Sequence, residues 1–109
     1  MAYDTVPDNL EFNIPVVNTE VTLHFQNNTA LTSSDDTTTD KYTDTNRTRN
    51  RYVVGADNAI VITKINGQTL TDPRTIPANL TFAESEVPGM VSITIRNEVA
   101  NTNVHCFMR

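Results

Sequence analysis

The stretch AIVITKINGQTL, residues 59–70, decides the fold that the sequence predicts. Five of its first seven residues are apolar, on both faces of an extended segment, which is typical of a central strand that is buried on both faces. Asn66 and Gly67 follow, and an Asn-Gly pair between extended segments predicts a type I′ hairpin because both central residues need positive φ. The return strand is expected to be short, over 68–70, since the two prolines in 71–77 indicate a connection.

Alternation of apolar and polar residues predicts further strands on both sides of this hairpin. Their segments are 10–16, with Leu10, Phe12, Ile14 and Val16 on one face; 20–26, with Val21, Leu23 and Phe25 on one face; 52–54; 79–83; 91–96; and 103–108, with Val104, Cys106 and Met108 on one face. Pro15 cannot donate to a ladder, so its strand belongs at a sheet edge or a bulge. Leu80 and Phe82 are expected to point inward, and Pro88-Gly89 predicts a type II turn.

Composition supports the same fold class. The chain has 18 Thr, 11 Val and 7 Ile against 5 Leu, and branched side chains suit a pleated sheet better than a helix. No window shows convincing helical periodicity. The sequence therefore predicts an all-β fold, a single antiparallel β-sandwich domain over 1–109 with six to eight short strands and one long polar loop. The strand order does not follow from the sequence, and an immunoglobulin-like sandwich and a jelly roll are both open.

Charge and cysteine content narrow the class of partner. The formal net charge is −5, which argues against nucleic acid, because phosphates demand a positive surface, and against an anionic membrane. The N-terminal residues lack a basic region and an apolar stretch, so no signal peptide is expected. Cys106 is the one cysteine, which excludes an intrachain disulfide, and we expect it to be a small buried apolar group. Proteins are the expected partners.

The residues that could carry chemistry do not form a catalytic pattern. His24 falls on the polar face of its predicted strand and is expected to be exposed. His105 adjoins Cys106, and neighbouring strand residues point to opposite faces, so they are not expected to act as a dyad. Glu84 and Glu86 are interpreted as a solvated acidic rim rather than an acid–base pair. We therefore expect no enzyme activity, no bound metal and no cofactor.

The segment 27–51 differs from the rest of the chain, because it is almost entirely polar. Long loops without structure of their own are uncommon in compact domains and often functional. Its charges are segregated, with aspartates first and arginines last. The candidate partner-binding residues are Asp35, Asp36, Asp40, Tyr42, Asp44, Arg47, Arg49 and Arg51.

Four interpretations of this segment are open. It could be a solvated hairpin whose halves attract each other weakly. Its aspartates could bind calcium, although their spacing does not fit an EF-hand and no glycine makes the tight bend. Its arginines, at alternate positions, could clamp phosphates or acidic side chains. It could also be an assembly arm that lies on a neighbouring subunit, which is the interpretation that we favour.

In size and composition the chain resembles the decoration or cement proteins and minor structural proteins of tailed bacteriophages, which are short, β-rich, Thr/Asn-rich and poor in Cys. The resemblance implies a homo-oligomeric structural role on a capsid or tail, in a virion assembled in the host cytoplasm. Two other classes are open. One is a carbohydrate- or receptor-binding module of a phage tail, baseplate or adhesin, for which Tyr3, Tyr42, Tyr52 and Phe107 are the candidate exposed aromatics. The other is an enzyme accessory or inhibitor domain.

Overall fold

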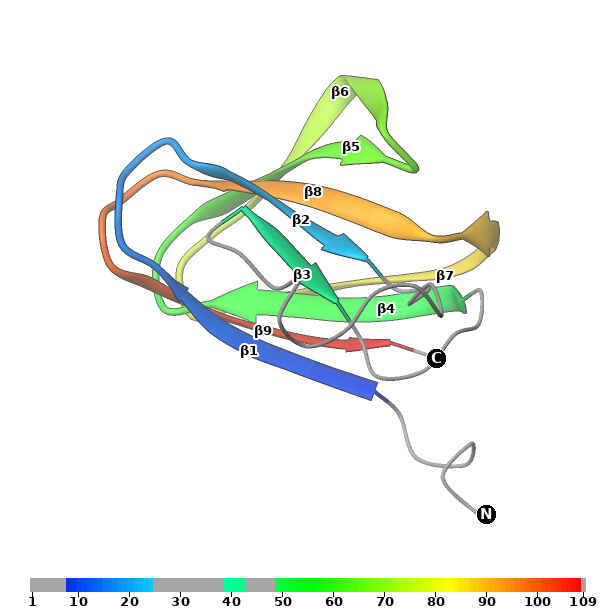
Figure 1. Cartoon of the computed structure of the whole chain (residues 1–109), viewed down its shortest axis with the longest axis horizontal. Helices are drawn as coiled ribbons and strands as arrows, with labels where there is room; N and C mark the ends of the chain where they lie inside the picture. Colours follow the sequence, from blue (N-terminus) through cyan, green and yellow to red (C-terminus); the bar gives the residue numbers. More distant parts are fainter. Residues whose placement is uncertain (1–7, 25–38, 43–48, 109) are drawn as a thin grey trace.

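Nine strands in two facing sheets make up the part of the chain that the computed structural model describes, residues 8–24, 39–42 and 49–108 (Figure 1). The strands are β1 (Asp8–Ile14), β2 (Glu20–His24), β3 (Asp40–Tyr42), β4 (Arg49–Ala56), β5 (Ile60–Ile65), β6 (Gln68–Ile76), β7 (Thr81–Met90), β8 (Ser92–Asn97) and β9 (Thr102–Met108). Sheet A has the order β1-β9-β4-β7, and sheet B has the order β3-β2-β8-β5-β6. The predicted all-β sandwich is confirmed, with more strands than the six to eight expected.

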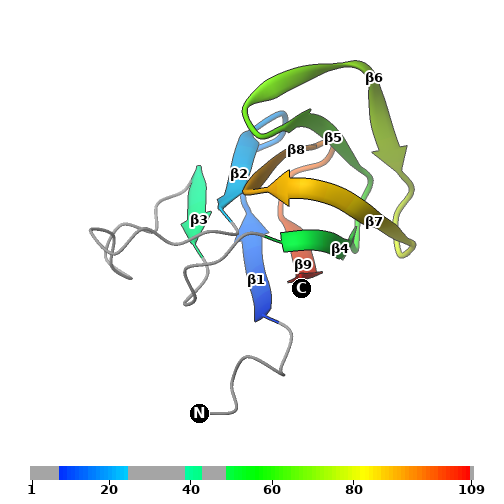
Figure 2. The same cartoon turned by 90° about the vertical axis from the view of Figure 1, so that its right-hand side faces the viewer.

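The strand pairs are nested. β5 pairs with β6, β4 with β7, β2 with β8 and β1 with β9, all antiparallel. This is one long hairpin, with its tip at Asn66-Gly67, folded over into two sheets. Of the two predicted topologies, the strand order is therefore that of a jelly roll. β3 is an addition, which pairs parallel with β2 at the edge of sheet B (Figure 2).

The hairpin at the tip is as predicted. Asn66 and Gly67 have φ of 52° and 76°, and Ile65 lies opposite Gln68. The side chain of Asn66 also accepts hydrogen bonds from the backbone N–H groups of Val91 and Ser92, at 2.8 and 3.2 Å. The turn is thereby joined to the connection between β7 and β8.

The core lies between the sheets. Its buried members come from eight strands and include Ile14, Val21, Leu23, Tyr52, Val54, Ile60, Ile62, Ile76, Met90, Ile93, Ile95, Val104 and Cys106. β5 is buried on both faces over most of its length, as predicted, whereas β8 was predicted to have one polar face and is also buried on both, with Ser92 and Thr94 covered. The predicted inward positions of Val104 and Cys106 are confirmed.

Several sequence predictions were wrong in their details. The return strand β6 does not end at Leu70 but continues through Pro73 to Ile76. β6 is an edge strand, where a missing N–H costs no ladder hydrogen bond, and its register with β5 shifts between Ile62 and Lys64. The segment 27–51, expected to be a loop, contains β3 and the first residues of β4.

Two side chains predicted to point inward lie outside the core. Val16 is 62% exposed because β1 ends at Ile14, before the alternation does. Leu80 is 56% exposed because it belongs to the turn before β7. The preceding Asn79 has a φ of 63°, which breaks the extended alternation that the prediction assumed.

The turns from β1 to β2 and from β8 to β9 are connected by the buried side chain of Asn97. Its Nδ2 donates to the carbonyl oxygens of Val16 and Val99, both at 2.9 Å, and its Oδ1 accepts from the backbone N–H of Thr19 at 2.9 Å. Replacing a buried amide of this kind destabilises the fold, because the backbone groups that it binds lose their hydrogen-bond partners.

We expect Asn97→Asp to lower the free energy of unfolding by about 2–4 kcal/mol, because a carboxylate cannot donate to the two carbonyl oxygens and adds a buried charge. Urea unfolding followed by circular dichroism measures the loss. Asn58→Asp, the same change of group at a half-buried residue of the nearby β4–β5 turn, is the control. Equal losses of unfolding free energy in the two variants would show that the hydrogen bonds of Asn97 add no stability beyond that of a half-buried asparagine.

Candidate functional site

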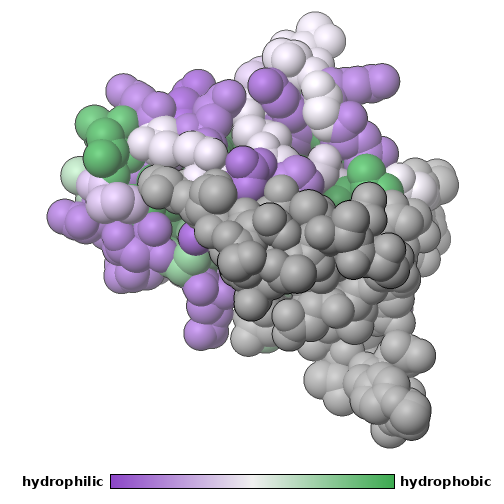
Figure 3. Space-filling model, in the orientation of Figure 1, coloured by the Kyte–Doolittle hydropathy of each residue, from purple (hydrophilic) through white to green (hydrophobic). Residues whose placement is uncertain are grey.

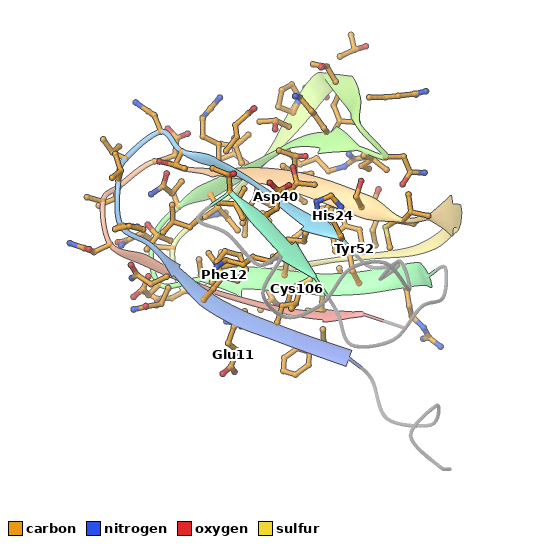
Figure 4. All side chains as sticks on the ribbon, in the orientation of Figure 1. Glu11, Phe12, His24, Asp40, Tyr52 and Cys106 are labelled. Carbon is orange, nitrogen blue, oxygen red and sulfur yellow. The ribbon has the colours of Figure 1, made fainter. Side chains whose placement is uncertain are left out.

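The outer face of sheet A carries the best-defined group of polar and aromatic side chains. Along β9 the side chains of Val104 and Cys106 are buried, whereas those of His105 and Phe107 point outward. Figure 4 shows Glu11 of β1 pointing away from the core. We call this surface the sheet A face, defined by Glu11, Asn13, Arg51, Val53, Asn103, His105 and Phe107.

The strand register orders these residues into rows across the sheet. Glu11 lies opposite His105, and Asn13 lies opposite Asn103. On the other side of β9, β4 places Gly55 opposite His105, and Val53 opposite Phe107. A polar row and an apolar row therefore cross the face side by side.

An open depression of about 410 Å³ lies on this face, lined by Glu11, Phe12, Asn13, Asn103, Val104 and His105. Gly55 gives the imidazole of His105 room beside it. A Cβ at Gly55 would lie 3.2 Å from His105 Nε2 and 2.7 Å from the carbonyl oxygen of Leu80. The latter distance is too short for any side chain to fit without a backbone shift.

A hydrogen-bond chain holds the polar end of the face. Asn13 Nδ2 donates to Asn103 Oδ1 at 3.0 Å, and Asn103 Nδ2 donates to Asp57 Oδ2 at 2.9 Å. The backbone N–H of Asn103 donates to Asp57 Oδ1 at 2.8 Å. These bonds from Asn103 to the carboxylate lower the pKa of Asp57 below its usual 3.8.

The apolar row consists of Phe107, 43% exposed, and Val53, 36% exposed. The rings of His105 and Phe107 are 6.2 Å apart between centroids and tilted. Large apolar side chains that adjoin on a surface mark contact sites more often than isolated ones do.

A second candidate surface lies at one end of the sandwich, where four turns that connect the two sheets are found. We call it the turn end, defined by residues 15–19, 57–59, 77–80 and 98–101. Of the six large hydrophobic residues that are exposed in the described part of the chain, four belong to it: Val16, Val17, Leu80 and Val99. Figure 3 shows hydrophobic atoms at this end, on the left.

A third group joins β2 to β3. His24 Nε2 lies 2.9 Å from Asp40 Oδ1, and both side chains are partly exposed, at 30% and 42%. His24 lies on the polar face of β2, as predicted, but it is only partly exposed, because the parallel pairing of β3 brings Asp40 beside it. The neighbouring Lys41 places its ammonium 5.7 Å from the ring centre of Phe12 on β1.

The structure separates the predicted partner-binding residues that it describes. Asp40 and Tyr42 lie in β3 of sheet B, whereas Arg49 and Arg51 lie in β4 of sheet A. Arg51 is exposed on the sheet A face. Asp35, Asp36, Asp44 and Arg47 lie outside the described residues. Among residues 8–24, 39–42 and 49–108, no three His, Cys, Asp or Glu side chains come together as metal ligands would.

Tyr52, a candidate exposed aromatic, is buried instead. Its hydroxyl donates to Glu84 Oε1 at 2.7 Å, and Glu84 Oε2 lies 2.9 Å from Arg74 Nη2. Burial is the larger cause that raises the pKa of Tyr52, and the hydrogen bond to the Glu84 carboxylate raises it further. Glu84 is therefore held in this network and does not belong to a solvated acidic rim. Phe107, another of the candidate aromatics for ligand binding, is exposed as predicted.

His105 and Cys106 do not meet, as predicted. The imidazole lies on the sheet A face, whereas the thiol is buried in the core, and burial raises the pKa of Cys106. Sequence reasoning missed the grouping of Glu11 and Asn13 with His105 and Asn103. Their strands are the first and the last that the structure describes, and only the register brings them together.

No protein-family model, no curated protein and no solved structure matches the chain. Within the described ranges no helix is long and apolar enough to cross a membrane.

We expect Asp57→Asn to lower the free energy of unfolding at pH 7. The folded state lowers the pKa of Asp57, so its contribution is present above 3.8, the unfolded value, and is lost as the pH falls through the lower folded-state pKa. The difference in the free energy of unfolding between wild type and variant should therefore be smaller at about pH 2 than at pH 7. Urea unfolding at both pH values measures it, with Asp72→Asn, an exposed aspartate of β6, as control. A difference that does not change with pH would contradict the assignment.

Proposed function

We propose that this chain is a non-enzymatic structural protein that holds neighbouring subunits of an assembly together, in the manner of a phage capsid decoration or cement protein. The observation that carries the proposal is the presence of two contact surfaces that point in different directions. The sheet A face points outward from one sheet, and the turn end points along the strands. A small module with two such surfaces is suited to bridge two neighbours.

The turn end is built rigidly enough for this role. Asn18 and Asn101 adopt the left-handed conformation, at φ of 60° and 57°, so both turns are tight. Asn97 ties them to each other from within. The exposed valines are thus held on a fixed backbone, which lowers the entropy lost on binding.

The predicted contact segment 27–51 is a third part of the proposal. Its aspartates precede its arginines, so it can meet charged partners of both signs. In an assembled virion such a segment would lie on neighbouring subunits. Jelly rolls occur in viral capsid proteins and in lectins, so the fold is compatible with a structural role and does not by itself decide it.

We expect the tagged chain to sediment with large particles when it is produced in its source cells and fractionated on a density gradient. Val16→Ser/Val17→Ser/Val99→Ser should remain at the top of the gradient as free protein, because the turn end loses its apolar contacts. Thr71→Ala, on the exposed edge of β6, should sediment like wild type. Wild-type chain that never sediments with particles would overturn the proposal.

Ligand binding is a second candidate function, favoured by the depression on the sheet A face. Amides of Asn13 and Asn103, the carboxylate of Glu11 and an adjacent aromatic ring are the groups that sugars use in binding sites. A glycan array followed by calorimetry tests this function. Saturable binding by a monomer, weakened about tenfold or more by Asn103→Ala, would favour it over the structural role.

A further inference from the structure

We propose that the sheet A face is a homotypic interface, at which two copies of the chain pack face to face about a two-fold axis through Phe107, with Glu11 of each copy opposite Arg51 of the other. This inference deepens the proposed structural role, on which it rests, by naming one partner as a second copy. It is carried by the arrangement of two charges about an apolar centre.

The strand register gives that arrangement. Phe107 lies on β9, between Asn9 of β1 and Val53 of β4. Glu11 is two residues beyond Asn9, opposite His105 and toward the turn end. Arg51 is two residues before Val53 and lies away from the turn end.

Phe107 is therefore the midpoint between the acid and the base. With strands about 4.8 Å apart and about 3.3 Å per residue, each charged residue starts roughly 8 Å from Phe107, on opposite sides of it. A two-fold axis that lies in the plane of the face, passes through Phe107 and runs perpendicular to the line from Glu11 to Arg51 exchanges these two positions. Each copy then presents its acid to the base of the other, and the ion pair forms twice.

The crossing of the strands agrees with known sheet packing. The line from Glu11 to Arg51 runs diagonally over β1, β9 and β4, so the axis perpendicular to it is also diagonal to the strands. Rotation about a diagonal axis sets the strands of the two copies nearly at right angles. Orthogonal crossing is one of the two common ways in which β-sheets pack face to face.

The groups concerned are available for a partner. Glu11 and Arg51 are exposed, and neither forms a salt bridge within the part of the chain that the structure describes. Between them, Phe107 and Val53 expose adjacent apolar surface, and Ala83 continues the row onto β7. Burial of this row supplies the attraction, and the charges select the orientation.

The size of the face sets the strength of the contact. Four strands about 4.8 Å apart and seven residues long cover roughly 440 Å², which is well below the roughly 800 Å² per partner of a standard interface. The dimer should therefore be weak and dependent on concentration. Such contacts are effective where copies are already held next to each other, as on a repeating lattice.

Sedimentation equilibrium of the purified full chain over a range of concentrations tests the interface. Wild type should show a reversible monomer–dimer equilibrium, and Phe107→Ser should be monomeric over the same range. Glu11→Arg and Arg51→Glu should each raise the dimer Kd about tenfold or more, because each change sets two like-charged pairs against each other. The double variant Glu11→Arg/Arg51→Glu exchanges the charges and should return the Kd to within about threefold of wild type.

Asp72→Arg, a comparable change on the exposed edge of β6, is the control and should leave the Kd unchanged. Thermal unfolding of each variant confirms that it folds, which is expected because the changed side chains are exposed. A wild-type chain that is monomeric throughout, a dimer indifferent to Phe107→Ser, or a double variant no tighter than the single ones would overturn the inference. Because only purified chain is used, the particle gradient and this experiment fail independently.

Discussion

The buried amide of Asn97 sits at the corner where the ribbon formed by β1 and β9 passes from sheet A into the ribbon formed by β2 and β8. Ile14 lies opposite Thr102 before the corner, and Glu20 lies opposite Arg96 after it, so the segments between these pairs, 15–19 and 97–101, have equal length and the register continues across them. Asn97 bonds to both turns. A slip of one residue would turn every buried side chain of these strands toward water. The shared core of the two sheets therefore depends on this contact.

The same constraint shapes the surface. Tight turns whose polar backbone groups face Asn97 leave their side chains pointing outward, and this is why Val16 and Val99 are exposed at the turn end. The β-strands add a second consequence, since alternate residues of β9 must point away from the core. His105 and Phe107 follow from this alternation. Both candidate contact surfaces are thus direct products of the way in which the fold closes.

The sequence predicts those features that depend on neighbours along the chain. Alternation identifies the two faces of β9, and the Asn66-Gly67 pair identifies the tip of the nested hairpin. The sequence does not predict the features that depend on the pairing of strands distant along the chain. Pro73 is tolerated because β6 is an edge strand, and an edge is a property of the strand order. Asp40 meets His24 only because β3 adds to β2, and a three-residue strand within a polar segment has no periodicity to detect. The candidate site is harder still, because its residues come from opposite ends of the described chain.

The sheet A face is built from strands that are distant in sequence. The sheet A face combines Glu11 of β1 with His105 and Phe107 of β9, which are the outermost pair of the nested strands, and with Arg51 and Val53 of β4. In a nested arrangement the outermost pair joins the residues most distant in sequence, so its loop-closure entropy is the largest. The face exists only where β1, β9 and β4 are paired, which requires both ends of the hairpin to have met. A partner that binds this face, whether a second copy or another molecule, therefore selects subunits that have completed folding.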